Sequence, residues 1–182
     1  MRATPQTPQQ YAAKNSKYLS KFTFKPYVFP KGFILKVDTR EQHSPLFLDK
    51  PPKGLVIVRD TLKNGDYSIV GAEDRFCVEK KYYGDLFPYC SIEMDSKTYP
   101  KMERFAEMIS KGGWVGLVIE NRPSDIFKWQ EYTKITPEAV RGALTKFAID
   151  YGVHVHFAGN RENASRFILD HAIRYYNKMH EL

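Results

Sequence analysis

The 182-residue sequence has few cysteines and no long apolar run. Its two cysteines, Cys77 and Cys90, have no metal-ligand spacing, which favours reduced thiols over a disulfide scaffold or a zinc site. No run of about 18 apolar residues is present, which excludes a transmembrane helix. The first residues are polar and lack the apolar centre of a secretory signal. We therefore expect a protein of the cytoplasm, or of the nucleus if its source is eukaryotic.

Acidic residues are missing from residues 1–37. This segment holds seven of the 28 basic residues, and the remaining 21 balance the 21 acidic residues of the chain. We regard residues 1–30 as a basic arm that contains Pro, Gln and Lys. Three uses of the arm stay open, namely a solvated tail, a transit peptide and a segment that contacts DNA phosphates. The candidates for such contacts are Lys14, Lys17 and Lys21.

Apolar residues make up 42% of the chain and aromatic residues 14%, which excludes a disordered protein. The length suits one domain, which we place at residues 31–182. Periodicity and turn residues predict strands at 33–37, 55–58, 66–70, 75–81, 114–120 and 153–157. They predict helices that begin near residues 82, 100, 137 and 162. The fold class is therefore α/β, with a mixed central sheet of about six strands flanked by helices.

The hairpin predicted at residues 66–81 brings two acidic residues together. A loop centred on residues 72 and 73 pairs positions whose numbers sum to 145, so Asp66 lies opposite Glu79. Like charges directly opposite each other destabilise a sheet, and a divalent metal between them would explain the register. Lys81 follows Glu79 by two residues and therefore points to the same face of its strand. Two carboxylates and an ammonium on one face are what metal-assisted phosphodiester hydrolysis requires.

Three charged residues, Asp38, Arg40 and Glu41, come directly after the first predicted strand, a position where α/β proteins tend to build sites. Asp38 could also cap the turn that follows, and both interpretations stay open. The last helix has an apolar stripe wide enough to serve the core and a dimer, so we expect a homodimer or heterodimer through the C-terminal helices.

Four short blocks of sequence stand out: Val37-Asp38-Thr39-Arg40-Glu41, Gly65-Asp66-Tyr67, Val78-Glu79-Lys80-Lys81 and Asp85. Together and in this order they resemble the XPF-type structure-specific endonucleases of the PD-(D/E)XK superfamily, whose signature is V-D-x-R-E, G-D-Y and E-R-K-x-x-x-D. The resemblance extends over residues 33–176. It implies a restriction-endonuclease-like core and a DNA endonuclease that selects branched or flapped DNA in repair or recombination.

The resemblance also implies a metal site. Asp66 and Glu79 would hold Mg²⁺ or Mn²⁺, with Asp38 and Asp85 as additional ligands, because hard cations prefer oxygen. Lys81 would orient the attacking water. The catalytic set that the resemblance implies is Asp66, Glu79, Lys81, Asp38, Asp85, Glu41 and Arg40.

The sequence departs from the family pattern at two points. Lys80 replaces the arginine of E-R-K, and Lys97 is an uncertain match to the arginine of a following S-L-x-x-G-R-L element. We expect both lysines to contact DNA. We expect no helix-hairpin-helix domain, which many family members carry. A sequence-specific restriction-type endonuclease and a catalytically silent DNA-binding subunit of a nuclease complex are the alternatives.

Overall fold

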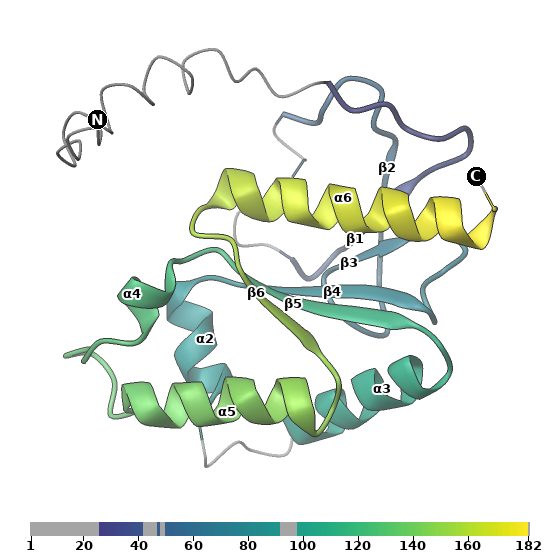
Figure 1. The fold of residues 1–182 in the computed structure, drawn as a ribbon. Coiled ribbons are helices and arrows are strands. Elements are labelled where there is room, and N and C mark those ends of the chain that lie inside the picture. Colours follow the sequence, from purple (N-terminus) through teal and green to yellow (C-terminus); the bar gives the residue numbers. More distant parts are fainter. Residues whose placement is uncertain (1–25, 42–46, 48–49, 92–97, 182) are drawn as a thin grey trace, which may run out of the picture.

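The computed structural model describes residues 26–41, 47, 50–91 and 98–181 (Figure 1). Six strands form one sheet in the order β2-β1-β3-β4-β5-β6. They are β1 (Leu35–Asp38), β2 (Ile57–Asp60), β3 (Tyr67–Ile69), β4 (Phe76–Lys81), β5 (Trp114–Ile119) and β6 (His154–Phe157). β3 runs antiparallel to β1 and β4, whereas β1–β2, β4–β5 and β5–β6 are parallel pairs. The predicted mixed sheet is confirmed.

Five helices are described: α2 (Tyr83–Tyr89), α3 (Thr98–Ser110), α4 (Pro123–Ile126), α5 (Pro137–Ile149) and α6 (Arg161–Met179). The start of α5 agrees with the prediction, because the Thr136 hydroxyl accepts a hydrogen bond from the backbone N–H of Ala139 at 3.2 Å. Helix α3 begins two residues earlier than expected. Its Pro100 is tolerated there because N–H groups of the first turn have no partner within the helix.

Strand β2 lies two residues later than predicted. Leu55 is part of a turn, where its N–H donates to the carbonyl of Pro52 at 3.0 Å. The strand itself is fixed by parallel pairing with β1, which aligns Leu35 with Ile57 and Asp38 with Asp60. Asp38 is therefore the last residue of β1 rather than the first residue after it.

The sheet lies between two helical layers. Helix α6 covers one face, and α2, α3 and α5 cover the other (Figure 1). Phe76 and Val78 of β4 pack into the core beneath α6, whereas Cys77 packs into the core on the opposite face. Because side chains alternate along a strand, Glu79 and Lys81 belong to the face of α2, α3 and α5.

Two aromatic residues at the end of the predicted arm pack against the core. The rings of Tyr27 and Phe29 stack with centroids 5.8 Å apart, and Phe29 stacks on Phe33 at the same distance. The DNA-contact candidates Lys14, Lys17, Lys21 and Lys97 lie outside the described residues. No helix in the described part of the chain is both long and apolar enough to cross a membrane.

Candidate active site

The hairpin of β3 and β4 has the predicted register. Tyr67 pairs with Val78, whose numbers sum to the predicted 145, and Asp66 comes directly before Tyr67 beside β4. The N–H of Asp66 donates to the carbonyl of Val78 at 2.8 Å, and its Oδ2 accepts a hydrogen bond from the N–H of Lys80 at 2.7 Å. The carboxylate is thus held against β4 by the backbone itself.

Gly65 makes this close approach possible. Its φ of +69° lies in the left-handed region, which side chains disfavour. A Cβ at this position would lie 2.3 Å from Cys77 Sγ and 2.8 Å from the carbonyl oxygen of Val78. A glycine is therefore required directly before Asp66, which gives the Gly-Asp pair a physical reason.

Glu79 is almost completely enclosed, with 1% of its surface exposed. Its Oε1 accepts hydrogen bonds from the ammonium groups of Lys81 at 2.6 Å and Lys101 at 2.8 Å. Its Oε2 is buried and has no hydrogen-bond donor among the described residues. Such an oxygen is costly to bury unless another group satisfies it.

The two facing carboxyl groups differ in pKa. Burial and the charge of Glu79 raise the pKa of Asp66 to about 7. Burial also acts on Glu79, but Lys81 and Lys101 outweigh it and hold the pKa of Glu79 below its usual range. Burial opposes the charge of Lys81, yet Glu79 and Asp66 raise its pKa above the ordinary value, so Lys81 is cationic at neutral pH.

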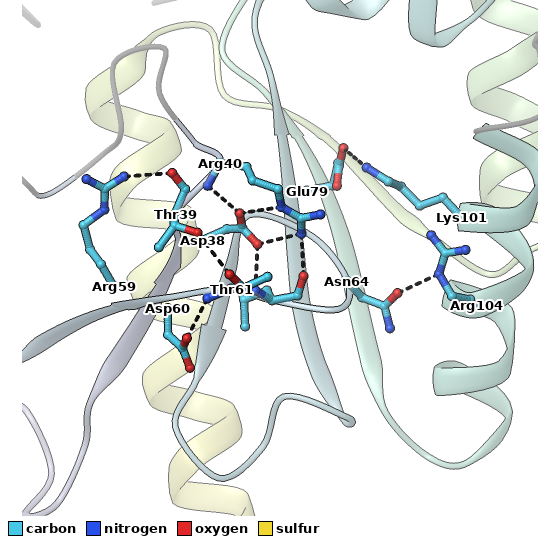
Figure 2. A network of polar contacts seen from close by, with 11 residues as sticks. Asp38, Thr39, Arg40, Arg59, Asp60, Thr61, Asn64, Glu79, Lys101 and Arg104 are labelled. Carbon is cyan, nitrogen blue, oxygen red and sulfur yellow. Dashed lines mark hydrogen bonds and ion pairs between the residues drawn. The ribbon is translucent and has the colours of Figure 1, made fainter.

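Asp38 is fully engaged with its neighbours (Figure 2). Its Oδ1 accepts from Arg40 N at 2.7 Å and Arg40 Nε at 2.9 Å, and its Oδ2 accepts from an Arg40 terminal nitrogen at 2.8 Å and Leu62 N at 2.7 Å. Burial is outweighed by these donors, which hold the pKa of Asp38 below its usual value. Asp38 thus fixes the Arg40 guanidinium, whose side chain remains 66% exposed.

The structure does not assemble the larger acidic cluster that the sequence suggested. Within the described residues, no three Asp, Glu, His or Cys side chains form a group that could hold a metal ion. Asp85 is exposed in the first turn of α2, and its charge contributes to the raised pKa of Lys81. The carboxylate pair, Asp66 and Glu79, is what remains at the centre of the site.

Lys80 faces away from that pair. It lies on the α6 side of β4 and is only 3% exposed, with its ammonium 3.0 Å from Glu41 Oε1 and 3.4 Å from Glu120 Oε1. The expected contact between Lys80 and DNA is incompatible with this burial. Glu41 likewise pairs with Lys80 rather than joining the carboxylate pair.

Sequence reasoning missed Lys101, the second ammonium on Glu79. It extends from α3, and no spacing along the chain relates it to Glu79. Figure 2 also shows Arg104, one turn further along α3, bonded to Asn64. These contacts arise from the packing of α3 against the sheet, which a local sequence pattern does not specify.

Three comparisons place this geometry among known proteins. The family model of the ERCC4 domain matches residues 37–170. XPF from Aeropyrum pernix superposes with a TM-score of 0.59 at 20% identity, over 81% of this chain and 67% of that one. The same protein in complex with DNA gives 0.59 at 21% identity, over 80% and 66%. No curated protein matches the sequence.

The chain thus spans about two thirds of the XPF chains that it resembles. The matched residues include both members of the carboxylate pair, together with Asp38, Lys81 and Lys101. The order of the blocks, the hairpin register and the mixed sheet agree with this match, and the chain belongs to the ERCC4 domain family with the fold of an XPF-type nuclease.

Proposed function

We propose that this protein is a metal-dependent DNA endonuclease that cuts branched or flapped DNA during repair or recombination. The observation that carries the proposal is the carboxylate pair itself. Asp66 directly precedes β3, Glu79 lies on the neighbouring β4, and the charge of Glu79 acts on the Asp66 carboxyl by raising its pKa. Glu79 Oε2 has no donor in the described part of the chain, and two ammonium groups bond Glu79 Oε1.

The carboxylate pair fits a hard divalent cation. Mg²⁺ is commonly bound through one or two carboxylates, with waters and substrate phosphates completing its shell. Asp66 and Glu79 would hold Mg²⁺ or Mn²⁺, and Asp38 and Asp85 are not needed as protein ligands. When bound, such an ion polarises a phosphate and lowers the pKa of a coordinated water.

Lys81 is suited to hold the attacking water or a phosphate oxygen. Its ammonium bonds Glu79 Oε1 at 2.6 Å and the carbonyl of Lys80 at 3.2 Å, and lies 4.8 Å from the centre of the Tyr89 ring. Because its raised pKa keeps it protonated, Lys81 donates hydrogen bonds and does not act as a base. Its role is to orient the nucleophile and to offset negative charge on the phosphate.

Arg40 is the second cation directed at the substrate. Asp38 holds its guanidinium from one side through two charge-assisted hydrogen bonds. The charges of Asp66 and Glu79 also raise the pKa of Arg40, which shows that the guanidinium lies within their field. We assign Arg40 a contact with the DNA phosphate and Asp38 the positioning of Arg40.

Cleavage assays test the proposal. The protein is incubated with flap, fork, Holliday-junction and linear duplex DNA in Mg²⁺, Mn²⁺ or EDTA. We expect cutting of the branched substrates with either metal and none in EDTA. Lys81→Met should abolish cutting while circular dichroism shows that the variant is still folded, and the exposed Lys178→Met should leave the rate unchanged.

Three results would overturn the proposal. Full activity in EDTA would show that no metal is used. Tight binding of branched DNA without any cutting in Mg²⁺ or Mn²⁺ would instead identify a silent DNA-binding subunit. Preferential cutting of linear duplex at one sequence would show that the protein recognises a DNA sequence and not a DNA shape.

We further propose that the protein works as a dimer through α6. Beside α6 lies the edge strand β6, where His156 stacks on Phe167 at 3.8 Å and Phe167 stacks on His171 at 3.8 Å. These rings are only half-buried in the single chain, so a partner could cover them. Sedimentation equilibrium of wild type and Phe167→Arg tests this, and a wild-type monomer at high concentration would rule out a homodimer.

A further inference from the structure

A groove of 510 Å³ lies between helix α3 and the turns at the two ends of strand β3. Its walls carry charges of both signs. The lining residues that bear on its charge are Lys63, Arg75, Arg104 and Lys111, together with Glu73, Asp74 and Glu107.

The acidic side chains of the groove are already neutralised. Each forms an ion pair: Glu73 with Lys36 at 2.6 Å, Asp74 with Arg75 at 3.8 Å and Glu107 with Lys111 at 2.7 Å. Lys63 and Arg104 have no acidic partner within 4 Å among the described residues. The groove is therefore net positive at these two side chains.

Arg104 is held in place by a buried amide. Its Nε donates to Asn64 Oδ1 at 3.0 Å, and Asn64 is only 8% exposed. The Asn64 amide nitrogen in turn lies 3.3 Å from Met108 Sδ. This bond uses one edge of the planar guanidinium and leaves its terminal nitrogens for an oxyanion, which an arginine can bind bidentately.

The groove and the active site use adjoining residues. Asn64, which lines the groove, directly precedes Gly65 and Asp66 in the sequence. Lys101 precedes Arg104 by three residues, which places their Cβ atoms roughly 5–6 Å apart on one face of α3. Lys101 bonds Glu79, and Arg104 follows it on α3 beside Asn64 (Figure 2), while Lys63 lines the same groove as Arg104.

We propose that this groove binds the phosphate backbone of the DNA strand that extends from the cleaved bond, with Lys63 and Arg104 as its contacts and Lys101 at the junction with the active site. The inference rests on the proposed nuclease function and assigns a path to its substrate. Paired acids with surplus cations suit a chain of phosphates, and the nearby carboxylate pair is the place where one phosphate would be cut.

Salt dependence of DNA binding tests the groove. The affinity of the full chain for a fluorescein-labelled fork is measured in EDTA over a series of KCl concentrations. Lys63→Met/Arg104→Met is compared with Arg174→Met/Lys178→Met, which removes the same charges from exposed positions on α6. Each lost phosphate contact lowers the slope of log K against log salt by about 0.7 to 0.9, so the groove variant should lose roughly 1.4 to 1.8.

The control pair should keep the wild-type slope. An unchanged slope in the groove variant, or an equal fall in both variants, overturns the inference. Lys63→Met alone alters only an exposed side chain and should lose about 0.7 to 0.9, which tests the groove should the double variant fold poorly.

Cleavage is scored separately. If the protein cuts branched DNA but the groove variant keeps the wild-type salt slope, the groove inference is wrong and the proposed nuclease function stands. If the groove variant has a lower salt slope but the wild-type protein cuts no DNA, the groove inference stands and the proposed nuclease function is wrong.

Discussion

Replacing Asp66 with Asn should make the protein more stable at alkaline pH while it abolishes cleavage. The substitution keeps an oxygen that can accept the hydrogen bond from Lys80 N, which Asp66 Oδ2 accepts at 2.7 Å. It removes the charge that faces Glu79. The native carboxyl is costly to ionise because burial and Glu79 raise its pKa from 3.8 to about 7.

The sign and size of the effect follow from proton linkage. A carboxyl whose pKa is raised on folding binds more protons in the folded state, so its contribution to stability is full below pH 3.8 and is lost as pH rises through 7. Between pH 5 and 8 this carboxyl alone should lower the free energy of unfolding by roughly 2 to 3 kcal/mol. The asparagine in Asp66→Asn has no acidic proton, so this part of the pH dependence of the unfolding free energy should disappear.

Urea unfolding in EDTA at pH 5, 6, 7 and 8 measures the effect. The difference in unfolding free energy between Asp66→Asn and wild type should grow with pH by roughly 2 to 3 kcal/mol over this range. The exposed Asp150→Asn serves as the matched control and should follow the wild-type curve. A difference that stays constant with pH would show that Asp66 is not strained by Glu79, which would remove the main reason for placing a cation there.

Three further predictions concern Gly65, Lys80 and the N-terminal arm. Gly65→Ala should lower the free energy of unfolding by about 2 to 4 kcal/mol, since its Cβ would meet Cys77 Sγ at 2.3 Å; urea unfolding with Gly142→Ala as the control measures this. Lys80→Met should cost about 3 kcal/mol because it leaves Glu41 and Glu120 without their cation, yet the salt slope of DNA binding should not change. Deletion of residues 1–25 should weaken DNA binding and flatten its salt dependence, whereas an unchanged slope would show that the arm makes no phosphate contacts.

The sequence predicted the fold where local patterns are strong. The β3–β4 hairpin follows from alternation on both sides of a short loop, and α5 follows from the Thr136 cap with a proline after it. β2 was displaced because its position depends on pairing with β1 and not on its own residues. α4 was missed, since a helix of four residues is too short to show a helical period.

The site was predictable only within one hairpin. The pairing of Tyr67 with Val78, which brings Asp66 beside β4, follows from the hairpin register, and the contact of Lys81 with Glu79 follows from strand alternation. Both can be read from positions along the sequence. Lys101 and Arg104 enter through the tertiary packing of α3, which those numbers do not contain. The role expected for Lys80 was wrong although alternation could have corrected it, because residues 76, 78 and 80 share the face of β4 that α6 covers.

The alternation of side chains along β4 places two separate groups of charged residues on the two faces of its C-terminal end. On the α6 side, Lys80 is enclosed by Glu41 and Glu120 and joins the ends of three segments. On the α3 side, Glu79 is bonded by Lys81 and Lys101 and faces Asp66, so two acids and two ammonium groups balance when all are ionised. A divalent cation added to this balanced group would leave it net positive, which favours a phosphate at that point. Binding of the scissile phosphate would then depend on the metal, whereas contacts by Lys63 and Arg104 in the groove would not, because neither side chain pairs with the carboxylates.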